Sequence, residues 1–157
     1  MPALVRFNFS QALLRLVIVV ALLLNSFCVH ADDAAQPKDC QAAYKELLAV
    51  DYFSFGGVGI GGTTSPGETC FKTIATSPDG LQLFKSALTN GTTESKLYAL
   101  CGIRKLAPTE FNSAAAPIIA KNPPVNLMSG CIASSIGSSN VVAQIKNGVF
   151  DLFVNTP

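Results

Sequence analysis

The glycine-rich stretch at residues 52–70 constrains the fold more than any other part of this sequence. It opens with Phe53 and Phe55, which predict a short apolar segment entering a core. Five glycines follow: Gly56, Gly57, Gly59, Gly61 and Gly62. Because glycine adopts backbone conformations that other residues avoid, these positions predict a loop. The loop is a possible ligand or partner loop through its backbone amides, although a purely structural role explains the same residues.

The glycines also match the bare pattern Gly-x-Gly-x-x-Gly of dinucleotide-binding loops. That fingerprint needs a helix opening at its third glycine and an acidic residue about twenty positions further on. Here the helix start is delayed to Ser65, which can cap a helix with Pro66 at its first position and Glu68 as the capping-box partner. The sequence therefore predicts no nucleotide and no other cofactor at this loop.

Residues 1–31 have the pattern of an export signal. Arg6 supplies positive charge, residues 16–24 are an unbroken apolar run, and Ala31 ends a small-residue cleavage site. The run is shorter than the ~20 residues that a membrane-spanning helix needs, so we expect no stable membrane anchor after cleavage. We predict a signal peptide at 1–31, a flexible leader at 32–37, a single globular domain at 38–157 and a periplasmic or secreted location.

Removal of the signal leaves 126 of the 157 residues, with nine Lys and Arg against ten Asp and Glu. Without a basic excess, nucleic acid is not an expected partner. Cleavage also removes His30, the only histidine. This excludes Ser-His-Asp and Cys-His mechanisms as well as histidine-ligated metal sites, and we predict no metal.

Four cysteines remain in the mature chain: Cys40, Cys70, Cys101 and Cys131. An even number in an exported protein predicts two disulfides. The preferred pairing joins Cys40 to Cys70 and Cys101 to Cys131, because each bond closes a short loop. Buried free thiols are an alternative, since Cys101 lies in an apolar run. Metal or redox chemistry is a third, although no Cys-x-x-Cys pair is present.

The rest of the chain predicts short helices joined by tight turns. Starts are expected at Asp39, Ser65, Ser77, Thr92 or Thr93, and Thr109, and Pro117 should bend or end the last of these helices. Residues 125–133 could form a strand, 134–139 a small-residue loop, 141–148 a last helix and 149–153 an extended tail. The expected fold is mainly α, a single small domain with a glycine-rich loop and a partly extended C-terminal segment.

The acidic residues give little support for catalysis. Five of them could pair for acid–base chemistry in principle: Asp51, Glu68, Glu94, Glu110 and Asp151. Most stand at predicted helix starts, where negative charge favours the helix. We therefore predict no catalytic residue. A histidine-independent hydrolase remains an alternative, and it would need two of these side chains in one cleft.

Three segments together resemble a family of small exported, largely uncharacterised bacterial proteins, some labelled microcin-associated. They are residues 53–59 (Phe-Ser-Phe-Gly-Gly-Val-Gly) with 63–68, residues 96–104 (Lys-Leu-Tyr-Ala-Leu-Cys-Gly-Ile-Arg) and residues 129–132 (Ser-Gly-Cys-Ile). The resemblance implies a bacterial periplasmic or secreted protein and transfers no catalytic residue. The expected function is a non-catalytic binding or accessory module of the cell envelope, with an unknown protein or small ligand as its partner. A small secreted toxin, immunity or inhibitor protein is the alternative outside enzymes.

Overall fold

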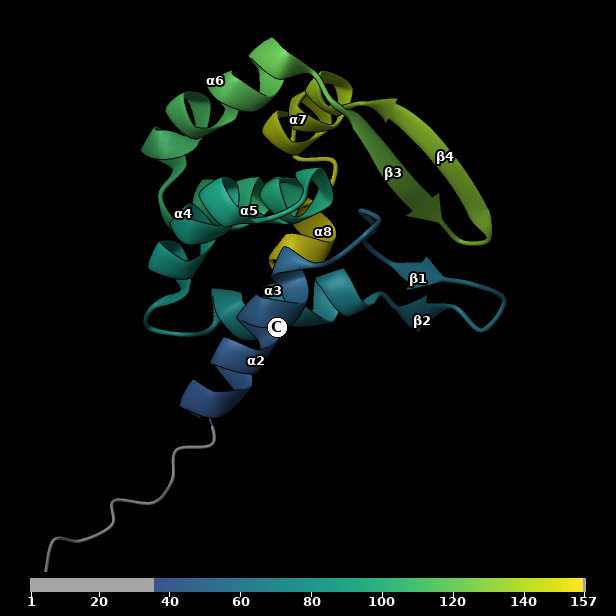
Figure 1. The fold of residues 1–157 in the computed structure, drawn as a ribbon. Helices are drawn as coiled ribbons and strands as arrows, with labels where there is room; N and C mark the ends of the chain where they lie inside the picture. Colours follow the sequence, from purple (N-terminus) through teal and green to yellow (C-terminus); the bar gives the residue numbers. More distant parts are fainter. Residues whose placement is uncertain (1–35, 157) are drawn as a thin grey trace, which may run out of the picture. The chain divides into compact units, whose positions relative to one another are not determined.

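The computed structural model describes residues 36–156 (Figure 1). The predicted signal peptide and its cleavage site lie outside these residues, as does most of the predicted leader. The described chain is mainly helical, which confirms the predicted fold class. Among these residues no helix combines the length and the apolar character that crossing a membrane needs.

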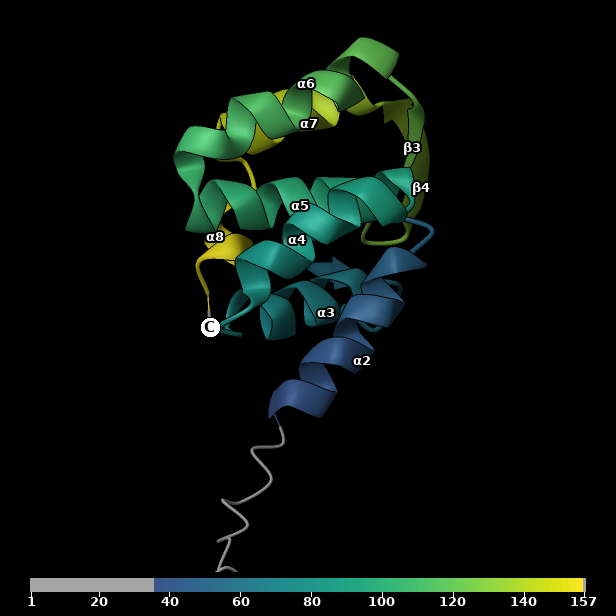
Figure 2. The same cartoon turned by 60° about the vertical axis from the view of Figure 1, so that its left-hand side comes forward.

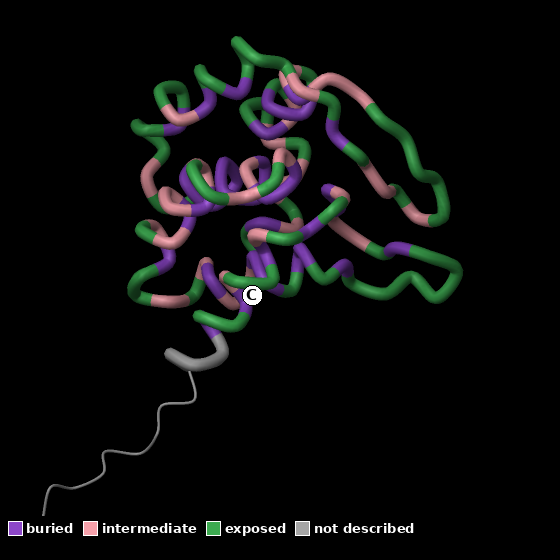
Figure 3. The backbone as a smooth tube through the Cα atoms, in the orientation of Figure 1, coloured by how far each residue is buried: buried purple, intermediate pink, exposed green. Residues whose placement is uncertain are grey.

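Helix α5, Thr93–Leu106, is the centre of the described fold. Thr92 caps it, because its side-chain oxygen accepts a hydrogen bond from the backbone N–H of Ser95 at 3.1 Å. Every residue from Leu97 to Ile103 is buried, so the helix is covered on all sides over these turns (Figure 3). A helix that is apolar all round has to lie inside a core rather than on its surface.

The other helices surround α5 (Figure 2). They are α2 (Gln36–Leu48), α3 (Pro66–Ala75), α4 (Gly80–Asn90), α6 (Phe111–Lys121), α7 (Ser138–Lys146) and α8 (Asp151–Val154), with a 3₁₀ turn at Pro108–Glu110. Helices α3, α4, α6, α7 and α8 contact α5 directly, whereas α2 packs on α3 and α4. The core is therefore built around one buried helix.

Two antiparallel hairpins project from the same side of this helical body (Figure 1). Strands β1 (Gly57–Val58) and β2 (Thr63–Thr64) form the first, and β3 (Pro124–Ser129) and β4 (Ile132–Gly137) form the second. Phe53 pairs in parallel with Leu127, and Val58 pairs in parallel with Gly130. The chain leading into β1 therefore runs along the outer edge of β3 and joins the hairpins.

An aromatic cluster anchors the start of the glycine-rich stretch in the core, as predicted. The ring centroids of Phe53 and Tyr98 lie 4.7 Å apart. Phe55 makes edge-to-face contacts with Phe71 at 5.4 Å and with Tyr98 at 5.3 Å. Such tilted and edge-to-face pairs are preferred geometries for aromatic rings. The apolar residues before the glycines thus fix where the first hairpin leaves the body.

Several predicted boundaries are wrong. Helix α2 begins at Gln36, so Asp39 lies inside it, and α4 begins at Gly80 rather than after Ser77. Pro117 lies within α6 and does not end it. Residues 134–137 belong to strand β4 instead of a loop, because pairing with β3 outweighs the weak strand propensity of serine and alanine. The predicted extended tail contains helix α8.

The predicted disulfides are also wrong: the four described cysteines are free thiols. Cys101 is buried within α5, whereas Cys131 is exposed at the turn between β3 and β4. A disulfide needs Cβ atoms about 3.8 Å apart, which a core position and an exposed hairpin turn do not provide. Cys40 and Cys70 are buried on the packed helices α2 and α3 and stay unbonded. Buried thiols, the alternative considered from the sequence, describe three of the four positions.

Candidate functional site

A pocket of about 280 Å³ lies where α2 ends and α3 begins. Its lining residues are Glu46, Ala49, Val50, Asp51, Tyr52, Pro66 and Gly67. The volume is near the lower limit for small-molecule sites, so it suits a small ligand or a single side chain of a partner. Two acidic residues and one aromatic ring are the groups in it that can select a ligand.

Hydrogen bonds from two sides fix the wall that carries Asp51 and Tyr52. Thr92 donates its backbone N–H to the carbonyl of Leu48 at 3.3 Å and its hydroxyl to the carbonyl of Val50 at 2.8 Å. The side-chain amide of Asn126 donates to the carbonyl of Asp51 at 3.1 Å. The segment after α2 is thereby tied both to the cap of α5 and to β3.

The opposite wall is the first turn of α3. Ser65 caps this helix as predicted, since its hydroxyl accepts the backbone N–H of Glu68 at 3.1 Å. Gly67 is required here by a close approach: a Cβ at this position would lie 2.5 Å from the ring of Tyr98. Tyr98 therefore packs directly beneath the wall of the pocket, where only glycine leaves it room.

The hydroxyl of Tyr98 fastens this region to the core. It donates to the carbonyl of Ser54 at 2.6 Å and accepts the backbone N–H of Ser54 at 2.9 Å. The Ser65 hydroxyl lies 3.3 Å away and donates to the same carbonyl at 3.0 Å. Burial raises the pKa of Tyr98 above its usual value, so the phenol stays protonated and can donate. The network is structural and gives the pocket a rigid base.

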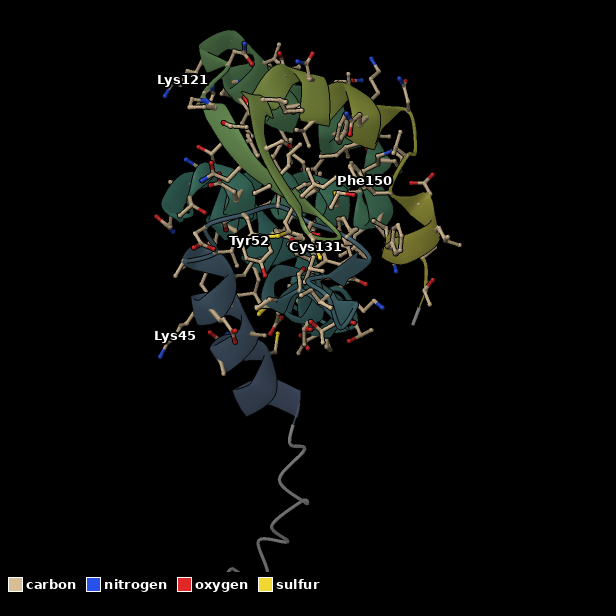
Figure 4. The ribbon with its side chains drawn as sticks, turned by 90° about the vertical axis from the view of Figure 1, so that its right-hand side faces the viewer. Lys45, Tyr52, Lys121, Cys131 and Phe150 are labelled. Carbon is tan, nitrogen blue, oxygen red and sulfur yellow. The ribbon has the colours of Figure 1, made fainter. Side chains whose placement is uncertain are left out.

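Charge in and beside the pocket is negative. The C-terminal end of α2 contributes partial negative charge and the N-terminal end of α3 contributes partial positive charge, so the net negative charge comes from Glu46 and Asp51. Lys45 is on the same helix, but its side chain points away from Tyr52 (Figure 4). Burial and, to a lesser extent, the nearby Glu46 carboxylate together raise the pKa of the Cys70 thiol to about 12. Cys70 is therefore neutral at physiological pH and leaves the charge of Glu46 uncompensated.

The glycine loop proposed from the sequence is hairpin β1–β2, and much of its backbone is engaged within the protein. Gly56 donates its N–H to the Glu68 carboxylate at 2.7 Å. Gly59 donates to the carbonyl of Gly130 at 2.9 Å, and Gly62 donates to that of Gly59 at 3.2 Å. A ligand role for this loop stays a prediction.

The five acidic residues singled out from the sequence are dispersed. Glu68 binds Gly56 and lies 3.3 Å from the ammonium of Lys72, and Glu94 accepts the N–H of Asn126 at 2.9 Å. Glu110 pairs with Lys85 at 2.7 Å, and Asp151 pairs with Arg104. Four of the five thus bind different structural partners, and Asp51 is the one that lines the pocket.

A second pocket of about 280 Å³ lies beside α8, and its lining includes Arg104, Lys105 and Asp151. Arg104 is held by Asp151, which raises the pKa of the guanidinium. Lys105 donates to the carbonyl of Val154 at 2.6 Å. The charges of this pocket are committed to fastening the C-terminal helix. Within residues 36–156, no three Asp, Glu, Cys or His side chains cluster as a metal site requires.

Sequence reasoning missed the pocket almost entirely. Asp51 was noted as one of five acidic residues, and Pro66 as the first residue of a helix. Glu46 and Tyr52 lie in a part of the sequence whose pattern indicates only an amphipathic helix and its end. Comparison with known proteins gives no significant match to a family model, a curated protein or a solved structure. The site therefore rests on its own geometry.

Proposed function

We propose that this protein is an exported, non-catalytic binding protein of the cell envelope, and that its pocket between α2 and α3 accepts a positively charged group. The observation that carries the proposal is the pairing of Glu46 and Asp51 with Tyr52 in one small pocket. The export pattern of residues 1–31 supports a periplasmic or secreted location.

The ligand chemistry follows from the lining. Carboxylates bind ammonium and guanidinium groups through charge-assisted hydrogen bonds. An aromatic ring adds attraction for a cation that lies over its face. The expected ligand is an ammonium or guanidinium group, carried either by a lysine or arginine side chain of a partner or by a small free amine.

The dispersal of the five acidic residues singled out from the sequence removes the pairs among them that a hydrolase would need, and leaves Glu46 and Asp51 as the two carboxylates that share a pocket. A hydrolase that works through carboxylates needs two of them at the reacting bond. Glu68, Glu94, Glu110 and Asp151 are each bonded to a different group. Binding, in contrast, needs only the fixed charges of the pocket.

The test is a titration with probes that differ in charge, followed by amide chemical shifts. N-acetyl-arginine amide and N-acetyl-lysine amide represent a partner's side chain, butylamine represents a free amine, and N-acetyl-glutamine amide is the neutral control. We expect the cationic probes to shift the amides of Tyr52 and Gly67 with dissociation constants of about 1 mM or weaker, because exposed charged contacts contribute little and 1 mM already corresponds to about 4 kcal/mol. The preferred probe distinguishes the two sources.

Matched variants decide whether the pocket carries the binding. Glu46→Gln with Asp51→Asn should abolish the shifts, whereas Glu110→Gln, which removes an exposed carboxylate elsewhere, should leave them unchanged. Equal binding of the neutral probe, or shifts that persist in the double variant, would contradict the proposal.

A further inference from the structure

We propose that the protein self-associates through strand β4, which pairs with β4 of a second copy to join the two hairpins into one sheet. The inference is independent of the pocket, because it rests on the backbone hydrogen-bonding groups along the outer edge of β4. Its partner is a second copy of this chain.

The direction of the backbone groups in β4 follows from the partners of β3. Phe53 donates to the carbonyl of Asn126 at 2.8 Å and accepts the N–H of Met128 at 3.1 Å, while the N–H of Asn126 is bound by Glu94. Asn126 and Met128 therefore turn their groups away from β4. In an antiparallel ladder the residues opposite them do the same, so Ser135 and Ala133 turn theirs outward.

The outer edge of β4 is open. Among residues 36–156, no group forms a hydrogen bond with the backbone of Ala133 or Ser135. Figure 1 shows no described element beside this edge, and the burial pattern of the strand is exposed along most of its length. Unpaired edge groups are a template for another strand.

The usual protections of an edge strand are missing from β4. Its sequence is Ile-Ala-Ser-Ser-Ile-Gly, without lysine, proline or an inward-pointing charge. The whole segment 122–145 contains no charged residue. Two copies of this edge therefore meet without like-charge repulsion, and their small side chains leave the backbones free to approach.

Self-pairing also has a favourable register. With the two Ser134 residues opposite each other, Ala133 of each copy forms a hydrogen-bonded pair with Ser135 of the other. Ile132, which is 71% exposed, then lies across from Ile136 of the second copy. Ile136 is half-buried and packs against the core, so this contact covers an exposed apolar side chain. That gain favours a second copy over an unrelated extended peptide.

Cysteine cross-linking tests the register. In a Cys131→Ser background, Ser134→Cys should form a disulfide-linked dimer readily, since facing residues of a non-hydrogen-bonded pair lie about 4.5 Å apart between Cα atoms. Ser135→Cys is the matched control: it is equally exposed on the same strand but faces Ala133 of the second copy. Equal cross-linking of the two variants, or none, overturns the proposal.

Light scattering over a range of concentrations tests association without a cross-link. The native chain should dimerise, and Ser135→Pro should weaken the dimer roughly tenfold or more, because each copy loses one outward N–H donor. Thermal unfolding of the monomer should stay unchanged, since that N–H is not bonded to β3. A native chain that stays monomeric at its highest soluble concentration overturns the proposal. This holds even if a segment of another protein is found to pair with the edge of β4. Neither result depends on whether the pocket binds a cation.

Discussion

The two edges of the β3–β4 hairpin differ in how their backbone is used. The edge of β3 is taken up by the helical body: Phe53 pairs with it and the buried carboxylate of Glu94 accepts one of its N–H groups. The edge of β4 has no such partner among the described residues. The difference teaches that the body occupies one edge of the hairpin with its own groups and leaves the other edge open. The first two predictions below set a buried position of the body against an exposed position of a hairpin, and the last compares positions within the first hairpin.

The largest expected effect is a loss of stability at alkaline pH. Burial raises the pKa of the thiols of Cys70 and Cys101 above the ordinary value of 9.0, and that of Tyr98 above 10.0. A group whose pKa is raised in the folded state stabilises the protein fully at pH below its unfolded pKa. This stabilisation is lost as the pH rises from the unfolded pKa toward the folded pKa. Each group therefore costs about 1.4 kcal/mol per pH unit above its unfolded pKa, and the three together cost about 7 kcal/mol by pH 11.

Urea unfolding between pH 7 and pH 11, with a reductant present, measures this loss. Cys101→Ala should reduce the slope of stability against pH above pH 9, because the unfolded chain then has one thiol fewer to ionise. Cys131→Ala, which removes the exposed hairpin thiol, should leave the slope unchanged. A free energy of unfolding that is level up to pH 11 would contradict the role of burial.

The next effect compares the two edges directly. Glu94→Ala should lower the free energy of unfolding by about 2 kcal/mol, because the N–H of Asn126 at the β3 edge loses its acceptor. Glu94→Gln keeps an oxygen in reach and should recover most of this loss. Ser135→Ala, on the open edge, should change stability by less than about 0.5 kcal/mol. Denaturant melts of the monomer that show equal losses for Glu94→Ala and Ser135→Ala would remove the distinction between the edges.

The features that could be predicted from the sequence are those that depend on residues close together along the chain. The caps at Ser65 and Thr92 are confirmed because a hydroxyl three residues before its N–H partner needs no tertiary information. The buried run around Cys101 was visible because seven consecutive small or apolar residues fit only a core. The mainly helical class followed from several such starts and stops.

Features that depend on distant residues were not predictable in this way. Strand β4 reads as a loop because serine and alanine have little strand propensity, and only its pairing with β3 makes it extended. The pocket joins the end of one helix to the start of another, across the glycine-rich stretch. The disulfide prediction came from compartment and cysteine count, which carry no information about where Cys101 and Cys131 point.

The smallest effect concerns the first hairpin, where alanine at Gly57 or Gly59 should lower stability. Gly59 has φ of +69°, a left-handed conformation that costs an alanine about 1 kcal/mol. Its N–H also joins the two hairpins through Gly130. At Gly57 the reason differs, because an added Cβ would lie 2.9 Å from the carbonyl oxygen of Gly62.

Gly61 supplies the matched control for these substitutions. A Cβ there would meet only the methyl group of Thr63 at 3.7 Å, an ordinary contact, and its φ is not left-handed. Gly61→Ala should therefore be neutral or slightly stabilising, because alanine restricts the unfolded chain. If thermal melts show the same small change for Gly59→Ala and Gly61→Ala, the backbone of the first hairpin adjusts freely and does not need the left-handed conformation at Gly59. A loss confined to Gly57 and Gly59 would instead show that the first hairpin is held in one backbone conformation, in which these two positions have no room for a Cβ or no freedom to change φ.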